Sequence, residues 1–330
     1  MKASGRETVE AAGMFAVLVL LYCGQALSEP YAYITNQGED SVSVIDTAVN
    51  RVIRSIPVGE KPAGVAVSAD GARVYVTNPQ SKDLSVIDVA AQRTVETVPL
   101  DSALVGIALA PSGRRIFLAD WFNNQLLVYD SESLKLVQRV PVGEAPAGVA
   151  VSPDGERIFV ANRDSNSVSL IDAATLDLVA EVPVGEHPFG ISVDGQGARL
   201  YTANVESNDV SVVDIAKRKT VAAIKVGDRP YATALARWDR RLLVTNQYDN
   251  SVSVIDTRTL KVVKTIEVGE YPEGIATHPD GRHVYVANWF SNNVSVIDAK
   301  YLKVIETIAT GEGSRAFGQF IPAGRKAGSN

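Results

Sequence analysis

One spacing constrains this chain more than any other feature: a block of 42 residues recurs seven times with no insertion or deletion. An Asn or Asp marks the end of one predicted strand in every copy, at Asn36, Asn78, Asp120, Asn162, Asn204, Asn246 and Asn288. An Asp closes the next predicted strand, at Asp46, Asp88, Asp130, Asp172, Asp214, Asp256 and Asp298. A fixed period of 20–50 residues is typical of an array or a propeller. The repeat therefore overrides the expectation, from a length of 330 residues, of one large or two medium domains.

Each copy carries four strand signals. In one copy they read EGIATH, HVYVAN, NVSVID and VIETIAT, at residues 273–278, 283–288, 293–298 and 304–310. All four are rich in Val, Ile, Tyr and Thr, as short strands are. A Pro-Asp-Gly sequence between the first and second strands predicts a tight turn. The Asn and Asp columns occur in all copies, so we interpret them as turn staples that bond the following backbone amides, and not as a carboxylate site.

The strand faces and the phase of the repeat predict a closed ring. The strand SVSVID (41–46) has no charged residue before its final Asp, so it needs cover on both faces, which blades packed around an axis provide. The chain starts in the second strand of a unit, at 31–36, and ends in a first strand, at 316–321. We therefore predict an all-β, seven-bladed β-propeller over residues 31–324. It has four antiparallel strands per blade, and the C-terminal strand closes the N-terminal blade, leaving 325–330 as a tail.

The repeat also resembles a known family. VYVTN (74–78) and its counterparts LLVTN and VYVAN precede SVSVID and then VG-x-x-P-x-G. This order is similar to the YVTN repeat of surface-layer-type, YncE-like propellers of bacteria and archaea. The similarity covers residues 31–324. It implies a secreted seven-bladed β-propeller, and it implies little about activity.

Residues 1–28 lie outside the repeat and have the pattern of a secretory signal peptide. Lys2 and Arg6 precede an apolar run at 11–22, and Ala26 and Ser28 are small residues at the −3 and −1 positions of a cleavage site. We expect a periplasmic or secreted protein with no transmembrane segment in the mature chain, the alternative being an uncleaved N-terminal anchor. The single cysteine lies in this leader, so we expect no disulfide, thiolate metal site or CxxCH haem attachment.

The charge and the histidines argue against several classes of function. A net charge of −6 disfavours a general nucleic-acid surface, which needs a basic face. The three histidines are scattered singly, and no HExxH or comparable ligand spacing is present. We therefore predict no metal site, no cofactor and a monomeric protein.

Exceptions to the repeat mark a candidate ligand site. In a propeller, the loop before the first strand and the loop between the second and third strands lie on one face, here called the upper face. Polar and aromatic residues flanking the Pro of the first loop cluster in the later copies and near the C-terminus: His187, Arg229, Tyr231, Tyr271, Glu273 and Arg315. Arginine offers a planar fork that suits carboxylate or phosphate, so we predict a small anionic ligand here. The alternative is a set of solvated loop side chains.

The second upper-face loop carries aromatic residues in three copies: Trp121, Phe122, Tyr248, Trp289 and Phe290. Aromatic side chains carry much of the energy of protein interfaces, so we interpret these residues as anchors for a partner protein. The alternative is that each ring packs on the neighbouring blade.

These observations favour an exported, non-catalytic propeller that binds a partner protein or a small anion, with a role beside a periplasmic redox enzyme as one variant. The alternative is a metal-independent lactonase or cycloisomerase in which Arg229 and Arg315 clamp a carboxylate. His187 or Glu273 would then act as the base. A third hypothesis is single-stranded DNA binding by stacking on Trp121 and Trp289, which the acidic balance disfavours.

Overall fold

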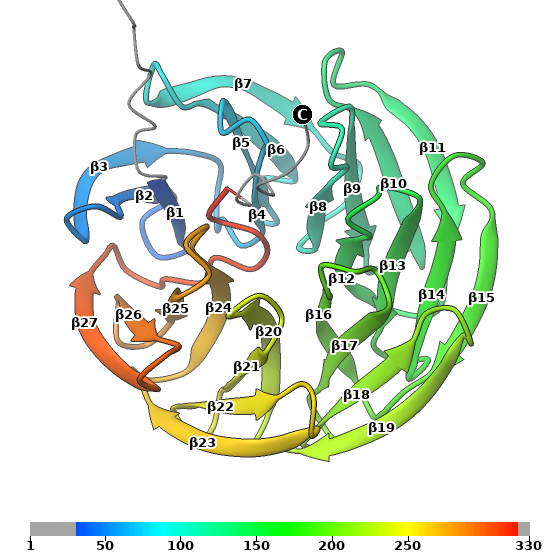
Figure 1. The fold of residues 1–330 in the computed structure, drawn as a ribbon. Helices are drawn as coiled ribbons and strands as arrows, with labels where there is room; N and C mark the ends of the chain where they lie inside the picture. Colours follow the sequence, from blue (N-terminus) through cyan, green and yellow to red (C-terminus); the bar gives the residue numbers. More distant parts are fainter. Residues whose placement is uncertain (1–30, 323–330) are drawn as a thin grey trace, which may run out of the picture.

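The computed structural model describes residues 31–322, so the expected signal peptide (1–28) and tail (325–330) lie outside the described residues. Seven blades stand in a ring, each with its first strand next to the axis and its last strand on the outside (Figure 1). The predicted all-β, seven-bladed propeller with antiparallel blades is confirmed. The described part of the chain contains no helix that could span a membrane.

The strands follow the chain from blade to blade. Their bounds are, in blade 1, β1 (Tyr31–Asn36), β2 (Ser41–Asp46) and β3 (Arg51–Pro57); in blade 2, β4 (Val65–Val67), β5 (Arg73–Asn78), β6 (Asp83–Asp88) and β7 (Arg93–Pro99); in blade 3, β8 (Ile107–Leu109), β9 (Arg115–Asp120), β10 (Gln125–Asp130) and β11 (Leu136–Pro141); in blade 4, β12 (Pro146–Val151), β13 (Arg157–Asn162), β14 (Ser167–Asp172) and β15 (Leu178–Pro183); in blade 5, β16 (Pro188–Val193), β17 (Arg199–Asn204), β18 (Asp209–Asp214) and β19 (Lys219–Lys225); in blade 6, β20 (Pro230–Ala236), β21 (Arg241–Asn246), β22 (Ser251–Asp256) and β23 (Lys261–Glu267); and in blade 7, β24 (Pro272–Thr277), β25 (His283–Asn288), β26 (Asn293–Asp298) and β27 (Lys303–Ala309).

Burial within a blade follows the strand sequences. The uncharged stretch of β2 is buried on both faces between neighbouring sheets, whereas β3, which carries two arginines, is mostly exposed on the outside. Every blade repeats this contrast, because two middle strands that lack charge must be covered on both sides. The apolar residues between adjacent blades form the core.

The Asn and Asp columns serve the fold in two different ways. The Asp column behaves as predicted: Asp172 Oδ1 accepts a hydrogen bond from the backbone N–H of Thr175 (3.1 Å). The Asn column does not, because Asn78 Nδ2 donates to Asp83 Oδ1 (2.6 Å) and Ser85 Oγ (2.9 Å) instead of accepting from the following amides. The prediction of a backbone staple was wrong for Asn, whose carboxamide ties two adjacent strands together through their side chains.

Glycines next to the axis set how closely the blades approach. A Cβ atom at Gly64 would lie 1.9 Å from the carbonyl oxygen of Val105, and one at Gly106 would lie 1.8 Å from that of Ala147. Such contacts are impossible for any side chain, so the glycine at this repeat position permits the backbones of neighbouring first strands to touch. The ring is therefore tight at its centre.

The C-terminal segment closes the ring as predicted, although it does so through isolated β-bridges and main-chain hydrogen bonds and not as the regular strand expected at 316–321. Residues 314–321 lie between β1 and β4 and supply the fourth position of blade 1 (Figure 1). The N–H of Tyr33 donates to the carbonyl of Phe320 (2.9 Å), and on the other side the N–H of Val65 donates to the carbonyl of Phe317 (2.9 Å). We call this segment the clasp.

The clasp also contributes to the hydrophobic core, because its Phe320 side chain is fully buried. We expect Phe320→Ala to lower the free energy of unfolding by about 3–5 kcal/mol, the usual cost of removing a buried aromatic ring. Chemical denaturation of the purified protein measures this change. Phe290→Ala, which removes an exposed ring, is the control and should change stability little. Equal effects of the two substitutions would contradict a clasp that holds the ring closed.

Candidate functional site

Loop geometry on the upper face is held from blade to blade. In blades 4–7, the residue before the Pro of the first strand has a left-handed backbone, as at His187 (φ 54°) and Tyr271 (φ 55°). Its N–H donates to an Asn of the preceding blade, from His187 to Asn166 Oδ1 (2.9 Å) and from Tyr271 to Asn250 Oδ1 (2.9 Å). The backbone thus fixes where the predicted site residues leave the scaffold.

Three of the predicted ligand residues form a buried polar network. Arg315 Nε donates to Glu273 Oε2 (2.5 Å), and Arg315 Nη2 donates to the Tyr231 hydroxyl (3.0 Å) and to Glu273 Oε1 (3.3 Å). Gln247 Nε2 donates to Glu273 Oε1 (3.0 Å). Glu273 is 1% exposed, so its charge is compensated by these partners and not by water. We call these four residues the central network.

Burial shapes the ionisation of this network. Burial raises the pKa of Glu273 above its ordinary value, while the Arg315 guanidinium and the Gln247 amide oppose that shift. Burial acts against the charged form of Arg315, but the Glu273 carboxylate outweighs it and holds the Arg315 pKa above its usual range. Burial also raises the pKa of the Tyr231 hydroxyl. Arg315 therefore stays charged, and Tyr231 stays protonated.

Aromatic rings meet next to the central network. Phe189 of blade 5 stacks on Tyr231 of blade 6 at 4.3 Å between centroids, and both contact Phe317 of the clasp, at 5.1 and 5.6 Å. Trp121 of blade 3 lies 6.1 Å from Phe189. Because blades 1 and 5 stand on different sides of the ring, these contacts bridge it and fill its upper centre.

A ladder of aromatic and cationic contacts runs outward from the same place. Arg315 lies over the ring of Trp289 (4.9 Å), Trp289 contacts Tyr271 (5.5 Å) and Tyr271 contacts Tyr248 (5.7 Å). Arg229 then lies over Tyr248 (5.4 Å). Three of the predicted ligand residues and two of the predicted anchors thus form one chain of contacts: Arg229, Tyr271, Arg315, Tyr248 and Trp289.

We call Tyr248, Tyr271, Trp289 and Phe290 the aromatic rim. Phe290 packs against Tyr271 (4.7 Å) and Trp289 (5.0 Å), yet it remains 58% exposed, and Tyr248 remains 57% exposed. The rim therefore combines rings that hold one another with two rings that face solvent.

The other two predicted anchors lie in blade 3 and differ from each other. Trp121 packs on Phe189 and carries the guanidinium of Arg163 over its ring (5.5 Å), as the packing alternative expects. Phe122 is 72% exposed.

His187 and Arg229 form a separate cluster around one carboxylate. Arg229 makes an ion pair with Glu206, and His187 Nδ1 lies 3.5 Å from the Glu206 Oε1 atom. The Arg229 pair holds the pKa of Glu206 below its usual value. Within residues 31–322, no hydrogen bond or ion pair joins this cluster to Glu273 and Arg315. Both arginines thus already have a carboxylate partner.

Four contributors were missing from the predicted site: Phe189, Glu206, Gln247 and Phe317. Phe189 occupies the same repeat position as Tyr231, Glu273 and Arg315, so comparing copies could have found it. Nothing in the sequence indicates that Glu206 and Gln247 pair with charged residues of the following blade.

Comparisons with known proteins agree on the propeller fold. Three family models match parts of the chain: the cytochrome D1 heme domain at residues 202–319, the YNCE-like β-propeller at 150–237 and the seven-bladed β-propeller lactonase at 91–178. The resemblance to YncE-like seven-bladed propellers is thereby confirmed. No curated protein sequence matches the chain.

Solved structures give the same result. Hydrazine synthase of Kuenenia stuttgartiensis aligns at 23% identity over 81% of this chain and 92% of that chain, with a TM-score of 0.73. A functionally unknown protein of Desulfotomaculum acetoxidans aligns at 17% identity over 87% and 99%, with a TM-score of 0.76. Dihydro-heme d1 dehydrogenase NirN in complex with DHE aligns at 16% identity over 86% and 74%, with a TM-score of 0.66. At these identities the similarity shows the fold alone.

The match to a heme domain raises the question of whether the centre of this ring fits a haem. A haem iron takes His, Cys, Met or Tyr as its axial ligand. In residues 31–322, the upper centre offers Tyr231, but its hydroxyl already binds Arg315 and its ring is stacked on Phe189. The touching rings of Phe189, Tyr231 and Phe317 occupy the space that a macrocycle needs. The residues at the upper centre do not fit a haem.

The central network predicts a pH-dependent stability. Arg315→Met leaves Glu273 buried without its counter-charge, which we expect to cost about 3–5 kcal/mol at neutral pH. The Glu273 pKa, raised by burial above the ordinary 4.5, rises further without Arg315. As the pH rises past 4.5, Glu273 loses its proton in the unfolded chain before it does so in the folded protein. The free energy of unfolding of the variant therefore falls further below that of the wild type towards pH 8.

Denaturation of wild type and variant between pH 4 and pH 8 measures this deficit. Arg229→Met is the matched control, because its partner Glu206 is solvent-accessible, and it should change stability little at any pH. A deficit of Arg315→Met that stays constant across this range would contradict the assigned role of Glu273.

Proposed function

We propose that this chain is an exported, non-catalytic propeller that docks a protein of a periplasmic redox system on its upper face. The aromatic rim is the observation that carries this proposal. Interfaces are enriched in Tyr, Trp, Phe and Arg, and a rigid aromatic anchor loses little entropy when it binds. The rim offers such anchors in Tyr248 and Phe290, supported from below by Tyr271 and Trp289.

The central network supports binding over catalysis. Glu273 and Arg315 satisfy each other, and Tyr231, which Arg315 also binds, packs against the rings of Phe189 and Phe317. A catalytic acid or base must reach the reacting atoms at hydrogen-bond distance. The network instead acts as a rigid floor for the rim, because Arg315 is held by Glu273 while it stacks on Trp289.

The redox setting rests on analogy between folds. The cytochrome D1 heme domain model matches residues 202–319, which include the whole rim, and two similar structures are a hydrazine synthase and a dihydro-heme d1 dehydrogenase. We infer that this propeller docks a redox protein rather than holding a redox cofactor, because its upper centre does not fit a haem. The secretory pattern of residues 1–28 agrees with a periplasmic location.

A small anionic ligand is the weaker form of the proposal. His187 and Arg229 face Glu206, so an incoming carboxylate or phosphate must displace an existing carboxylate partner. Arg163 is likewise paired with Asp164 and stacked on Trp121. These ion pairs favour a protein surface with its own mixed charges over a single small anion.

Truncation of the exposed rim tests the docking face. We expect the double variant Tyr248→Ala and Phe290→Ala to bind its partner at least about tenfold more weakly, because two interface anchors are lost. The immobilised protein is incubated with periplasmic extract of the source cells, and the captured fraction is assayed for bound protein and for haem or flavin absorbance. Trp238→Ala is the matched control, since Trp238 is 76% exposed at the opposite ends of the strands.

Three results count against this proposal. If the rim variant captures the partner as strongly as the wild type does, the rim is not the interface. Capture that Trp238→Ala weakens equally shows nonspecific adhesion to exposed rings. Capture of a protein that carries no redox group would be consistent with the rim as a docking surface but would contradict the assignment to a redox system.

The lactonase alternative has one observation in its favour, the family match at residues 91–178. His187 and Glu273 lie outside that range, and they belong to separate clusters. We expect the purified protein to hydrolyse no lactone above the rate in buffer. Hydrolysis that Glu273→Gln abolishes would establish the enzyme and overturn the non-catalytic proposal.

Single-stranded DNA binding needs free aromatic faces for the bases. Arg163 lies over Trp121, and Arg315 lies over Trp289. Each of the two predicted stacking rings thus already holds a guanidinium on one face.

A further inference from the structure

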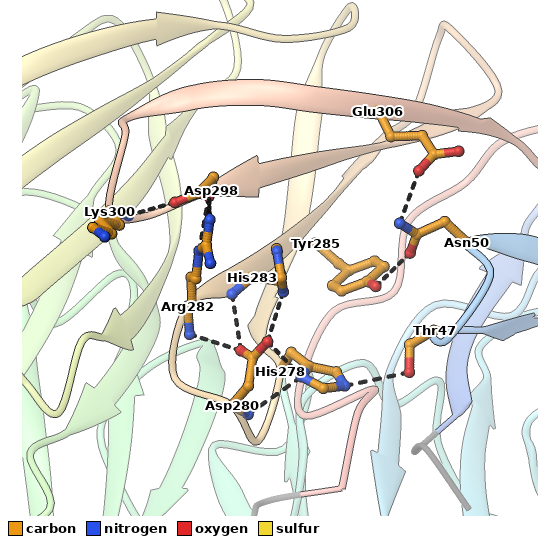
Figure 2. A network of polar contacts seen from close by, with 10 residues as sticks. All are labelled: Thr47, Asn50, His278, Asp280, Arg282, His283, Tyr285, Asp298, Lys300 and Glu306. Atoms are coloured by element: carbon orange, nitrogen blue, oxygen red, sulfur yellow. Dashed lines mark hydrogen bonds and ion pairs between the residues drawn. The ribbon is translucent and has the colours of Figure 1, made fainter.

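Two of the three histidines of the chain come together on the lower face, although the sequence spacing made them look isolated. His278 and His283 flank Asp280 on the turn that joins β24 to β25 (Figure 2). One ligand atom from each of these three residues lies within 4.8 Å of the other two. We propose that His278, Asp280 and His283 form a binding site for one divalent transition-metal ion.

The other blades show what this turn needs for folding alone. At the same repeat positions, blade 4 has Ser152, Asp154 and Arg157, and blade 2 likewise has Ser, Asp and Arg. In blade 4, Ser152 Oγ donates to Asp154 Oδ1 and accepts from the N–H of Arg157 (2.9 Å). Blades 2 and 4 therefore form this turn with the Asp and a small hydroxyl, not with histidine. In blade 7 both remaining positions have become imidazoles that face the same carboxylate.

The two carboxylate oxygens of Asp280 have different partners: one bonds the backbone of the turn, and the other faces the two imidazole rings. Its Oδ1 atom accepts from the backbone N–H of Arg282 (2.7 Å) and of His283 (3.0 Å). Its Oδ2 atom lies 2.6 Å from His283 Nδ1 and 3.3 Å from His278 Nδ1. One carboxylate oxygen therefore faces both imidazoles.

The ring of His278 is held in the orientation that a ligand needs. Its Nε2 atom lies 3.3 Å from Thr47 Oγ1 of blade 1, and its Nδ1 atom accepts from the backbone N–H of Asp280 (3.2 Å) (Figure 2). The Nδ1 lone pair is thus directed into the turn, while the outer nitrogen contacts a hydroxyl. An outer hydrogen bond of this kind is typical of metal-binding histidines. A metal ion would replace the contact from the Asp280 amide.

Access and spacing suit a metal ion with open positions. The side chains of Asp280 and His283 are 36% and 32% exposed, whereas that of His278 is 10% exposed. Ligands about 2.0–2.1 Å from a tetrahedral zinc ion lie about 3.3–3.4 Å apart, which matches the His278–Asp280 separation. The exposed His283 ring needs to move outward by about 0.7 Å from its hydrogen bond to Asp280, by the same geometry.

The donor set defines the class of metal. Two imidazole nitrogens and one carboxylate suit Zn²⁺, Cu²⁺, Ni²⁺ or Fe²⁺, whereas Ca²⁺ and Mg²⁺ prefer oxygen ligands throughout. The adjacent guanidinium of Arg282 is neutralised by Asp298, with Nη2 and Oδ2 at 2.5 Å, so it repels a cation less.

Titration of the tag-free, chelator-treated protein with Zn²⁺ and Co²⁺ tests the site, by calorimetry and by the visible absorption of bound Co²⁺. We expect one equivalent of either metal to bind. His278→Ser and His283→Arg restore the residues found in blade 4, so they should fold, and each should weaken binding at least about tenfold. His187→Ser removes the third histidine, on the upper face, and should leave binding unchanged. Asp280→Asn, which keeps an oxygen for the backbone bonds, is a further variant that should also weaken binding.

Absence of a one-equivalent site in the wild type overturns the proposal. So does binding that survives both histidine substitutions, or binding that only His187→Ser removes. Partner docking is measured with rim variants at the opposite ends of the strands, so failure of either proposal can be recognised without the other.

Discussion

Closure of the ring by main-chain hydrogen bonds is the constraint on which the rest of this structure depends. The clasp bonds to β1 through Tyr33 and to β4 through Val65, so one segment joins the end of the chain to the first two blades. The clasp also carries Arg315 and Phe317 to the upper centre. The bonds that complete the fold thus also complete the central network.

The tight centre of the ring explains why the candidate site lies on the rim. Glycines at the axis let neighbouring backbones touch, and the rings of Phe189, Tyr231 and Phe317 fill the space above them. Propellers with wider centres have room for a ligand on the axis. Here the exposed aromatic surface lies further out, on loops whose backbones are fixed by the preceding blade.

The repeat made the fold predictable, because each copy of 42 residues supplies the four strands of one blade. The repeats begin with the second strand of a blade and end with a first strand, so the last segment must complete the first blade. The repeat also identified Tyr231, Glu273 and Arg315, since exceptions stand out against identical copies. It could not show that Arg315 reaches Glu273 across a blade boundary, because repeat position fixes the place on the ring and not the direction of a long side chain. For the same reason Arg315 looked like a ligand clamp although it has a buried partner.

Two other features could not be predicted from the sequence, for different physical reasons. The carboxamide of Asn78 bonds the side chain of Ser85 on the adjacent strand, a choice that depends on register and not on local turn preference. His278 and His283 converge because a tight turn brings both ends of a five-residue step together, as the 2.8 Å bond from the N–H of His278 to the carbonyl of His283 shows. Motif spacings drawn from helices do not describe such a turn.

The position of the clasp at the end of the chain has a consequence for the timing of assembly. Synthesis proceeds from the N-terminus, so blades 2–7 and three strands of blade 1 are made before the clasp leaves the ribosome. Until then Glu273 has no counter-ion and Trp289 has no guanidinium over its ring. A molecule without the clasp therefore lacks both the finished central network and the guanidinium that covers Trp289.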